Sequence, residues 1–179
     1  NRVSELIHTF KTVATDQHIE QLHSFSLAGF FKNTLTSLEP NLNKKSITIK
    51  QDYDHELMLY GYPGILWQVF SNLIMNSLIH GYADVDVGVI KIAVQLNADV
   101  VTITYSDDGC GMSDEVKENI FLPFYTTKRQ NGGTGLGMHI VYNLVTHKLK
   151  GTLTCQSEMG SGTEFLITLP LETKPLGQA

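Results

Sequence analysis

Asp107-Asp108-Gly109-Cys110-Gly111 and the later stretch Gly133-Thr134-Gly135-Leu136-Gly137 decide the fold of this chain. The first follows an alternating apolar run at residues 100–105 that predicts a β-strand, and the second opens a run at 136–149 whose spacing predicts a helix. Glycine lets a phosphate or another backbone approach closely. A helix that begins in such a loop offers free N–H groups and its positive dipole end to an anion. Because Asp107 can accept hydrogen bonds from an amine, the combination predicts a purine nucleotide site.

Neither glycine loop fits the two best-known nucleotide motifs. The chain has no GxxxxGK[ST] sequence, which excludes a P-loop. The dinucleotide fingerprint GxGxxG also fails, because Gly137 is followed by Met138-His139 with no glycine at the required place. Taken singly, each loop is equally consistent with a tight turn in an α/β domain, so the prediction depends on further residues.

An asparagine pair on a predicted helix supplies those residues. Residues 65–80 form a strongly apolar helical pattern after the start signal at 61–64, and Asn72, Asn76 and His80 fall at i, i+4 and i+8 on one face of it. A row of polar side chains in an apolar helix requires partners. An amide oxygen suits Mg²⁺, which binds through few protein groups together with phosphates. The alternative is that these asparagines only cap neighbouring backbone groups.

Composition restricts the classes of protein to which the chain can belong. Its 179 residues allow one domain, and a hydrophobic content of 42% is typical of a globular core. A net charge of −5 argues against nucleic acid as a partner, and no apolar run is long enough to span a membrane. Cys110 and Cys155 form no disulfide framework, which favours a reducing compartment. Cys110 is interpreted as a small filler rather than a redox switch.

The remaining segments predict an α+β domain. Ser26 caps a helix that Pro40 ends, and Ser113 caps a short helix at 114–120. In residues 121–132 the aromatic half could anchor on the core, and the polar half is predicted to form a mobile lid, in which Lys128 and Arg129 could reach phosphates. The other predicted elements are an amphipathic helix at 1–15, a strand at 19–25, an antiparallel hairpin of 46–50 with 56–60, a second hairpin of 89–96 with 100–105, and strands at 151–156 and 163–169.

In this order and spacing, the motifs resemble the GHKL ATP-binding fold and, within it, the catalytic domain of bacterial sensor histidine kinases. The resemblance implies a two-layer α/β sandwich with a mixed sheet covered by helices on one face. The motifs that carry it are an N box at 72–77, a first glycine box at 107–112, an F box at 121–124, a second glycine box at 133–138 and a closing turn at 160–165.

The resemblance also implies roles for individual residues. Asp107 would accept the adenine amino group, Asn76 would bind Mg²⁺, and Asn72 and His80 would support the phosphates and the metal as the other catalytic residues. Residues 125–133 would form the ATP lid, and the amides of Gly135–Gly137 would hold the terminal phosphates. The full set of implied ATP-binding residues is Asn76, Asp107, Gly109, Gly111, Met112, Phe124, Thr126, Thr127, Lys128, Gly133, Thr134, Gly135, Leu136, Gly137, Met138 and Thr163.

One position separates the branches of the family. Its hydrolytic members have a glutamate one turn before the metal asparagine, as the base that activates water. Here that residue is Asn72, which favours phosphoryl transfer over hydrolysis. A GHKL-fold ATPase or an anti-sigma-type serine kinase is the alternative, and a degenerate binding module is a third hypothesis.

The resemblance predicts a fragment of a larger protein. Residues 1–18 would be the end of a dimerisation-hairpin helix, 19–171 the ATP-binding domain and 172–179 a disordered tail. None of His8, His18 or His23 has the context of a phosphate acceptor. The expected partners are therefore ATP, the dimerisation and histidine-phosphotransfer domain of the same protein, which would form a homodimer, and a response regulator. Neither nucleic acid nor direct membrane contact is expected, and the expected location is the cytoplasmic side of an inner-membrane sensor.

Overall fold

A five-stranded mixed sheet is the centre of the fold. The computed structural model describes residues 21–128 and 134–171, and the sheet has the order β2-β4-β5-β7-β6. β2 is parallel to β4, and the other neighbouring pairs are antiparallel. The strands are β2 (Ser46–Asp52), β4 (Val87–Asn97), β5 (Val100–Asp107), β6 (Thr152–Glu158) and β7 (Gly162–Pro170).

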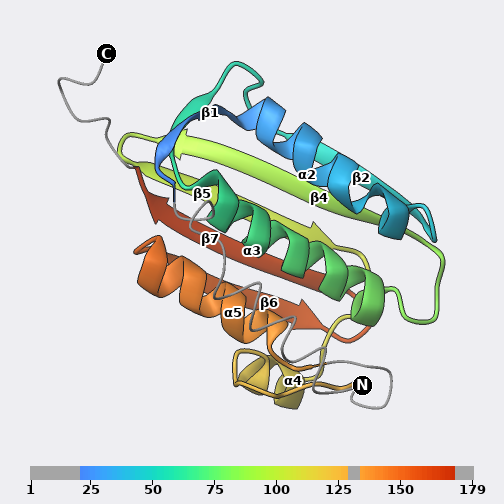
Figure 1. Ribbon diagram of the computed structural model, residues 1–179. Helices are drawn as coiled ribbons and strands as arrows, with labels where there is room; N and C mark the ends of the chain where they lie inside the picture. The colour runs from blue at the N-terminus through green and yellow to red at the C-terminus, as the bar shows by residue number, and fades with distance from the viewer. Residues whose placement is uncertain (1–20, 129–133, 172–179) are drawn as a thin grey trace, which may run out of the picture.

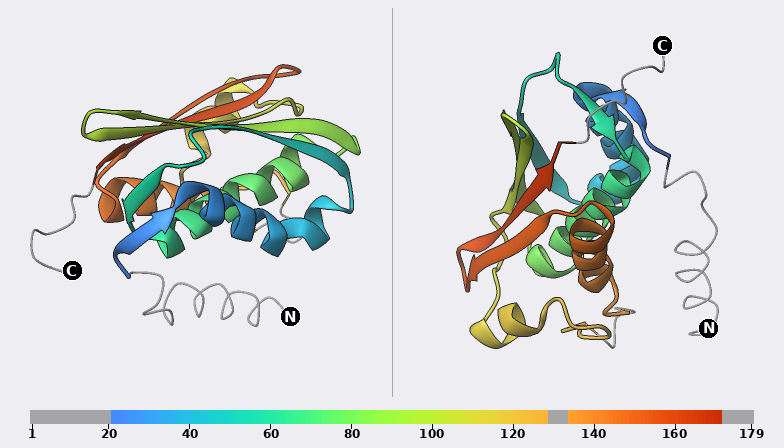
Figure 2. Two further views of the ribbon diagram at one scale, coloured as in Figure 1. Left: turned by 90° about the horizontal axis from the view of Figure 1, so that it is seen from above. Right: turned by 90° about the vertical axis from the view of Figure 1, so that its left-hand side faces the viewer.

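Helices cover one face of this sheet, so the predicted two-layer sandwich is confirmed. α2 (Leu27–Leu42), α3 (Pro63–Asn76) and α5 (Gly137–Asn143) lie side by side beneath the strands (Figures 1 and 2). Alternate residues of β5 point towards them, and Val101, Ile103, Tyr105 and Asp107 are buried. Apolar residues on this face form the core. Asp107 is therefore a charged residue at the end of a row of core residues.

The hairpin predicted for residues 46–50 and 56–60 is wrong. β2 instead pairs with β4, and β3 (Met58–Gly61) pairs with β1 (His23–Ser26) in a separate two-stranded sheet. A turn between them, in which the Asp54 side chain accepts a hydrogen bond from the Glu56 amide at 2.9 Å, redirects the chain. Short separation in sequence favoured local pairing, but β2 and β3 each pair with a strand that lies farther away in the sequence. The hairpin of β4 with β5 was predicted correctly.

The predicted ends of three helices also need correction. Ser26 caps α2 as expected, accepting a hydrogen bond from the Gly29 amide at 3.2 Å, but α2 continues past Pro40 to Leu42. A proline in the last turn leaves the later amides free to bond, as Asn43 does to the Glu39 carbonyl. The other two helices end in π-helical turns, η1 (Ser77–Gly81) after α3 and η3 (Leu144–Lys148) after α5. α4 (Asp114–Asn119) follows its predicted Ser113 cap.

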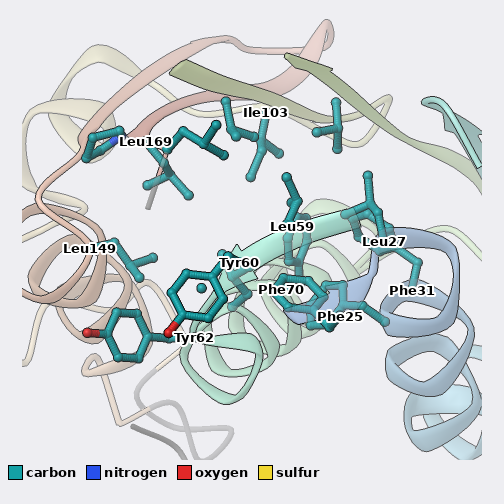
Figure 3. Close-up of a pocket in the computed structure, with 17 residues that line it drawn as sticks. Phe25, Leu27, Phe31, Leu59, Tyr60, Tyr62, Phe70, Ile103, Leu149 and Leu169 are labelled. Atoms are coloured by element: carbon teal, nitrogen blue, oxygen red, sulfur yellow. The ribbon is translucent and has the colours of Figure 1, made fainter. Parts of the chain in front are cut away.

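The two ends of the sheet differ in chemistry. At the beginning of β5, apolar side chains from β1, β3, α2, α3 and the sheet line a pocket of about 50 Å³ (Figure 3). At the opposite end of β5 lie Asp107, the end of α3 and the beginning of α5. The described helices include none long and apolar enough to cross a membrane.

Candidate nucleotide site

Asp107 ends β5 as a buried acceptor. Its carboxylate accepts hydrogen bonds from the Ser77 hydroxyl at 2.6 Å and from the Gly109 amide at 3.0 Å, and only 8% of the residue is exposed. Burial raises the pKa of Asp107, while the bonds from Ser77, Gly109 and the Thr163 backbone oppose that rise. A carboxylate held in this way is suited to an amine, which is what adenine presents.

Ser77 is a site residue that the sequence reasoning missed. It is the first residue of η1, directly after Asn76, and only 4% of it is exposed. Its hydroxyl also lies 2.8 Å from that of Tyr105, a core residue of β5. Serine in a helix is ordinary, and only its position beside Asp107 reveals its role. The available signal was its place within the N box.

The first glycine box is packed tightly against backbone. A Cβ on Gly109 would lie 2.7 Å from the Gly81 carbonyl oxygen, which also accepts a hydrogen bond from the Cys110 amide at 2.8 Å. Gly111 has φ of +67°, and a Cβ there would overlap the carbonyl oxygen of Glu158. These two glycines are therefore required by close approach and by backbone conformation. The loop that contains them follows β5 and packs against both η1 and the β6–β7 turn.

A second carboxylate secures this loop from the other side. Asp108 accepts hydrogen bonds from the Tyr82 hydroxyl at 2.9 Å and from the Val89 amide at 2.7 Å. Tyr82 is completely buried, and its hydroxyl also lies 3.0 Å from the Val89 carbonyl oxygen. Its pKa is raised, first by burial and then by the bond to Asp108. The predicted roles included neither residue, because their pairing depends on the turn after α3.

The predicted asparagine face lies against the beginning of α5. Gly137 is the first residue of that helix, and a Cβ there would lie 3.0 Å from Asn72 Oδ1 and 3.7 Å from Asn76 Oδ1. Asn72 Nδ2 donates to the Gln68 carbonyl at 2.8 Å. Among the described residues, Asn76 Nδ2 is buried without a hydrogen-bond partner. Buried amides normally have partners, so this one indicates a group that is bound in the working molecule.

His80 lies where the asparagine face meets the lid segment. Its Nδ1 is 3.1 Å from the Thr127 hydroxyl. Burial lowers the pKa of His80, and the nearby charge of Lys128 lowers it further. The imidazole therefore favours its neutral form more than an exposed histidine does. Thr126, on the same segment, accepts a hydrogen bond from the Lys128 amide at 3.1 Å.

The other predicted site residues lie around Asp107 and the asparagine face, and they differ in how far they are buried. Phe124 is exposed with φ of +64°, and Gly135, with φ of +69°, lies against its backbone. The Met112 amide donates a hydrogen bond to the Ser157 hydroxyl at 2.9 Å, and the Thr163 hydroxyl lies 3.1 Å from the Ser157 hydroxyl. Ser157 is thus a further residue that the sequence reasoning missed.

Three more of the predicted residues lie at and after residue 134, where the described part of the chain resumes. Thr134 is exposed, Leu136 is half-buried and Met138 is in the core. Gly133, like Arg129, lies outside the described residues.

Together these residues place two kinds of group at the same end of the sheet. One end offers a buried carboxylate, and the other offers amide side chains, a helix beginning and the cationic Lys128. No cluster of three or more His, Cys, Asp or Glu residues that could hold a metal occurs in the part of the chain that the structure describes. A metal at this site would therefore depend on amide oxygens and on the phosphates themselves.

Comparison with known proteins identifies the class of this domain. A family model described as histidine kinase-, DNA gyrase B-, and HSP90-like ATPase matches residues 61–173. The chain belongs to this family. Its domain is an ATP-binding catalytic domain of the histidine kinase type, as the resemblance implied.

Similar proteins support this assignment. The chain is 29% identical over 96% of its length to sporulation kinase B of Bacillus subtilis (strain 168), and 36% identical over 63% to the sensor histidine kinase CpxA of Escherichia coli (strain K12). It spans 39% of the first and 24% of the second. The solved catalytic domain of the histidine kinase ThkA superposes with a TM-score of 0.70 at 25% identity, covering 84% of this chain and 96% of that one.

Proposed function

We propose that this domain binds Mg·ATP and transfers the γ-phosphate to a histidine on a dimerisation domain of the same protein. The observation that supports it best is the convergence of Asn72, Asn76 and Gly137. These residues bring two amide side chains to the beginning of a helix, and within the described residues the buried Nδ2 of Asn76 has no hydrogen-bond partner. Helix beginnings favour phosphate groups.

Asp107 would bind the base. Ser77 and Gly109 already donate hydrogen bonds to its carboxylate. The remaining lone pairs of the carboxylate can accept a hydrogen bond from the adenine amine. Gly81 leaves room beside it, because a Cβ there would lie 3.3 Å from Asp107 Oδ1.

Asn76 would hold the magnesium ion. An amide oxygen is a hard neutral ligand that suits Mg²⁺, and the nitrogen of the same amide can donate to a phosphate oxygen. The residues present therefore fit the ion. When bound, Mg²⁺ neutralises charge on the phosphates.

Asn72 favours transfer over hydrolysis. Its side-chain amide donates a hydrogen bond to the Gln68 carbonyl at 2.8 Å, which fixes the orientation of the Asn72 side chain one turn before Asn76. An amide cannot take a proton from water, so the domain lacks a general base at this position. His80 and Lys128 would then act by orienting and neutralising the phosphates.

The proposed partners follow from the same chemistry. Phosphoryl transfer needs an acceptor, and we expect a dimerisation domain in a homodimer, followed by a response regulator. ThkA, the similar kinase, has been solved in complex with the response regulator TrrA. We place this domain on the cytoplasmic side of a membrane sensor, where ATP is available.

Calorimetry with ATP and with a non-hydrolysable analogue, with and without Mg²⁺, tests the proposal. Wild type should bind in a magnesium-dependent way, and Asp107→Asn should lose binding. Asp99→Asn is a matched control, because it makes the same change at the exposed turn before β5. A supplied dimerisation hairpin should then become phosphorylated on histidine. Absence of binding, or rapid hydrolysis by the domain alone, would contradict the proposal.

A further inference from the structure

Three buried side chains form a hydrogen-bonded chain that ends on Asp107. The Tyr105 hydroxyl lies 2.8 Å from the Ser77 hydroxyl, which lies 2.6 Å from Asp107 Oδ2. The exposed fractions of Tyr105, Ser77 and Asp107 are 0%, 4% and 8%. Water therefore has little access to these groups, and each depends on the others for its hydrogen bonds.

The charge of Asp107 determines which hydroxyl group donates in each hydrogen bond of this chain. If Asp107 is ionised, Tyr105 donates to Ser77 and Ser77 donates to the carboxylate, so every proton has an acceptor. If Oδ2 is protonated and donates to Ser77, the Ser77 proton must turn to Tyr105, and the Tyr105 proton needs another acceptor. Within the described residues the Tyr105 hydroxyl makes no hydrogen bond except that with Ser77. Since an unsatisfied buried donor is costly, the chain favours ionised Asp107.

The other oxygen of Asp107 is held as well. Oδ1 accepts from the Gly109 amide at 3.0 Å, while Oδ2 accepts from Ser77. Both oxygens therefore have fixed donors, and the carboxylate cannot rotate without breaking one bond. An oriented carboxylate that only accepts hydrogen bonds discriminates between a ligand amine and a ligand carbonyl.

We propose that Ser77 and Tyr105 are positioning residues that set the base selectivity of this site. They keep Asp107 as an oriented acceptor, so that a purine with an amine at its six-position binds and one with a carbonyl there is rejected. This inference rests on the proposed function, because it assumes that Asp107 meets the base. It adds a role for two residues that need not touch the nucleotide.

Other ionisable groups face Asp107 from the surrounding elements. Asp108 lies in the same loop, Tyr82 follows η1, and Cys155 lies on β6. The pKa of Tyr82 and that of Tyr105 are raised above the ordinary tyrosine value, and burial raises the pKa of Cys155 to about 11. The two tyrosines and Cys155 therefore do not titrate between pH 5 and 8. The His80 ring lies against the Thr127 hydroxyl, and His80 is retained in every variant of the test.

Ser77→Ala and Tyr105→Phe test the inference. ATP and GTP binding would be measured by calorimetry from pH 5 to 8 for wild type and each variant. In Ser77→Ala the preference for ATP should fall about tenfold, since a bond to a charged group is lost, and the loss of ATP binding in acid should move to higher pH. Ser77→Thr should restore both. Tyr105→Phe should change both in the same direction by less, because Ser77 can still donate.

Ser71→Ala is the matched control, since Ser71 lies on α3 and its hydroxyl, within the part of the chain that the structure describes, bonds only to the Gln68 carbonyl. A purely structural loss would weaken ATP and GTP equally at every pH. Unchanged selectivity and an unchanged acid limb in both Ser77→Ala and Tyr105→Phe would overturn the inference. If wild type also binds ATP and Asp107→Asn does not, the proposed function survives that result. Failure of wild type to bind ATP would overturn both.

Discussion

Single glycines leave space at the asparagine face, where we propose that the phosphates bind. Gly137 is the clearest case, because its missing side chain leaves the space between the beginning of α5 and Asn72. It does not have a left-handed backbone conformation, so glycine is required there for space alone. Stability and function should therefore separate at this residue.

Gly137→Ala should weaken ATP binding by about tenfold or more while leaving the fold intact. The added Cβ would lie 3.0 Å from Asn72 Oδ1, in the region that the phosphates need. Because the side chain of Asn72 can shift, the free energy of unfolding should change by less than about 0.5 kcal/mol. Calorimetry and urea denaturation of the same preparation measure the two effects.

Gly29→Ala is the control for this change. Gly29 lies inside α2, where a Cβ would meet Ser26 at an ordinary 3.7 Å. It should stabilise the protein by about 0.5–1 kcal/mol and leave ATP binding unchanged. Equal ATP affinity in Gly137→Ala and wild type would contradict the assigned phosphate position.

Residue types alone predicted several residues that the structure brings together, but not the residues that support them. The glycines, Asp107 and the asparagine pair could be predicted because their chemistry is unusual for an apolar helix or a strand end. Ser77, Tyr105 and Tyr82 could not, because a serine or tyrosine acquires its role only from a partner brought close by folding. Their partners lie on other elements, at separations that local patterns do not encode.

The element that connects these residues is the π-helical turn after α3. A π-turn inserts an extra residue into a helix and often occurs at functional sites. Here η1 directs Ser77 and Gly81 towards the first glycine box, and its end is fixed by Tyr82. The sequence predicted one continuous helix to residue 80, because apolar periodicity does not distinguish an α-turn from a π-turn.

Tyr82→Phe should loosen this element. The change removes a fully buried hydroxyl that is bonded to Asp108 and to the Val89 carbonyl, so the free energy of unfolding should fall by about 1–2 kcal/mol. ATP affinity should fall as well, because Gly81 and Gly109 are in contact. Urea denaturation and calorimetry measure these effects.

Tyr53→Phe is the comparison variant, because the Tyr53 hydroxyl bonds to Gln51 at the surface. It should cost less than about 0.5 kcal/mol. An equal cost for the two variants would show that the Tyr82 hydroxyl does not hold the turn.

At the scale of the whole molecule, the site reduces the stability of the protein without nucleotide. Burial places the folded-state pKa of Asp107 above the ordinary 3.8. The folded state therefore binds the proton more tightly than the unfolded state, and the free energy of unfolding falls as pH rises from 3.8 through the folded-state pKa. The lowered pKa of His80 acts oppositely, because the free energy of unfolding rises with pH from its folded-state pKa up to 6.5.

Asp107→Asn should remove the first of these trends and retain the second. Urea denaturation without nucleotide, at intervals from pH 4 to 8, measures the free energy of unfolding. Asp99→Asn should follow the wild-type curve. If Asp107→Asn kept the pH dependence of the wild type, burial of the Asp107 carboxylate would not lower the free energy of unfolding.

The arrangement of the sheet was less predictable than its strands. Alternation located β4, β5, β6 and β7, and the caps located α2 and α4, because those signals are local. The pairing of β2 with β4 could not be predicted, because helices separate the two strands in the sequence. It depends on how the apolar faces of strands and helices pack together. Sheet order is a property of the packed core rather than of any one segment.

The position of β7 has a consequence for how the protein is made. β7 lies between β5 and β6, although it is the last of the described strands to be synthesised. Until it emerges from the ribosome, β5 has an unpaired edge and the carbonyl of Asp107 lacks the Gly162 turn that packs on it. A chain released before β7 is made therefore presents an open strand edge to chaperones and proteases.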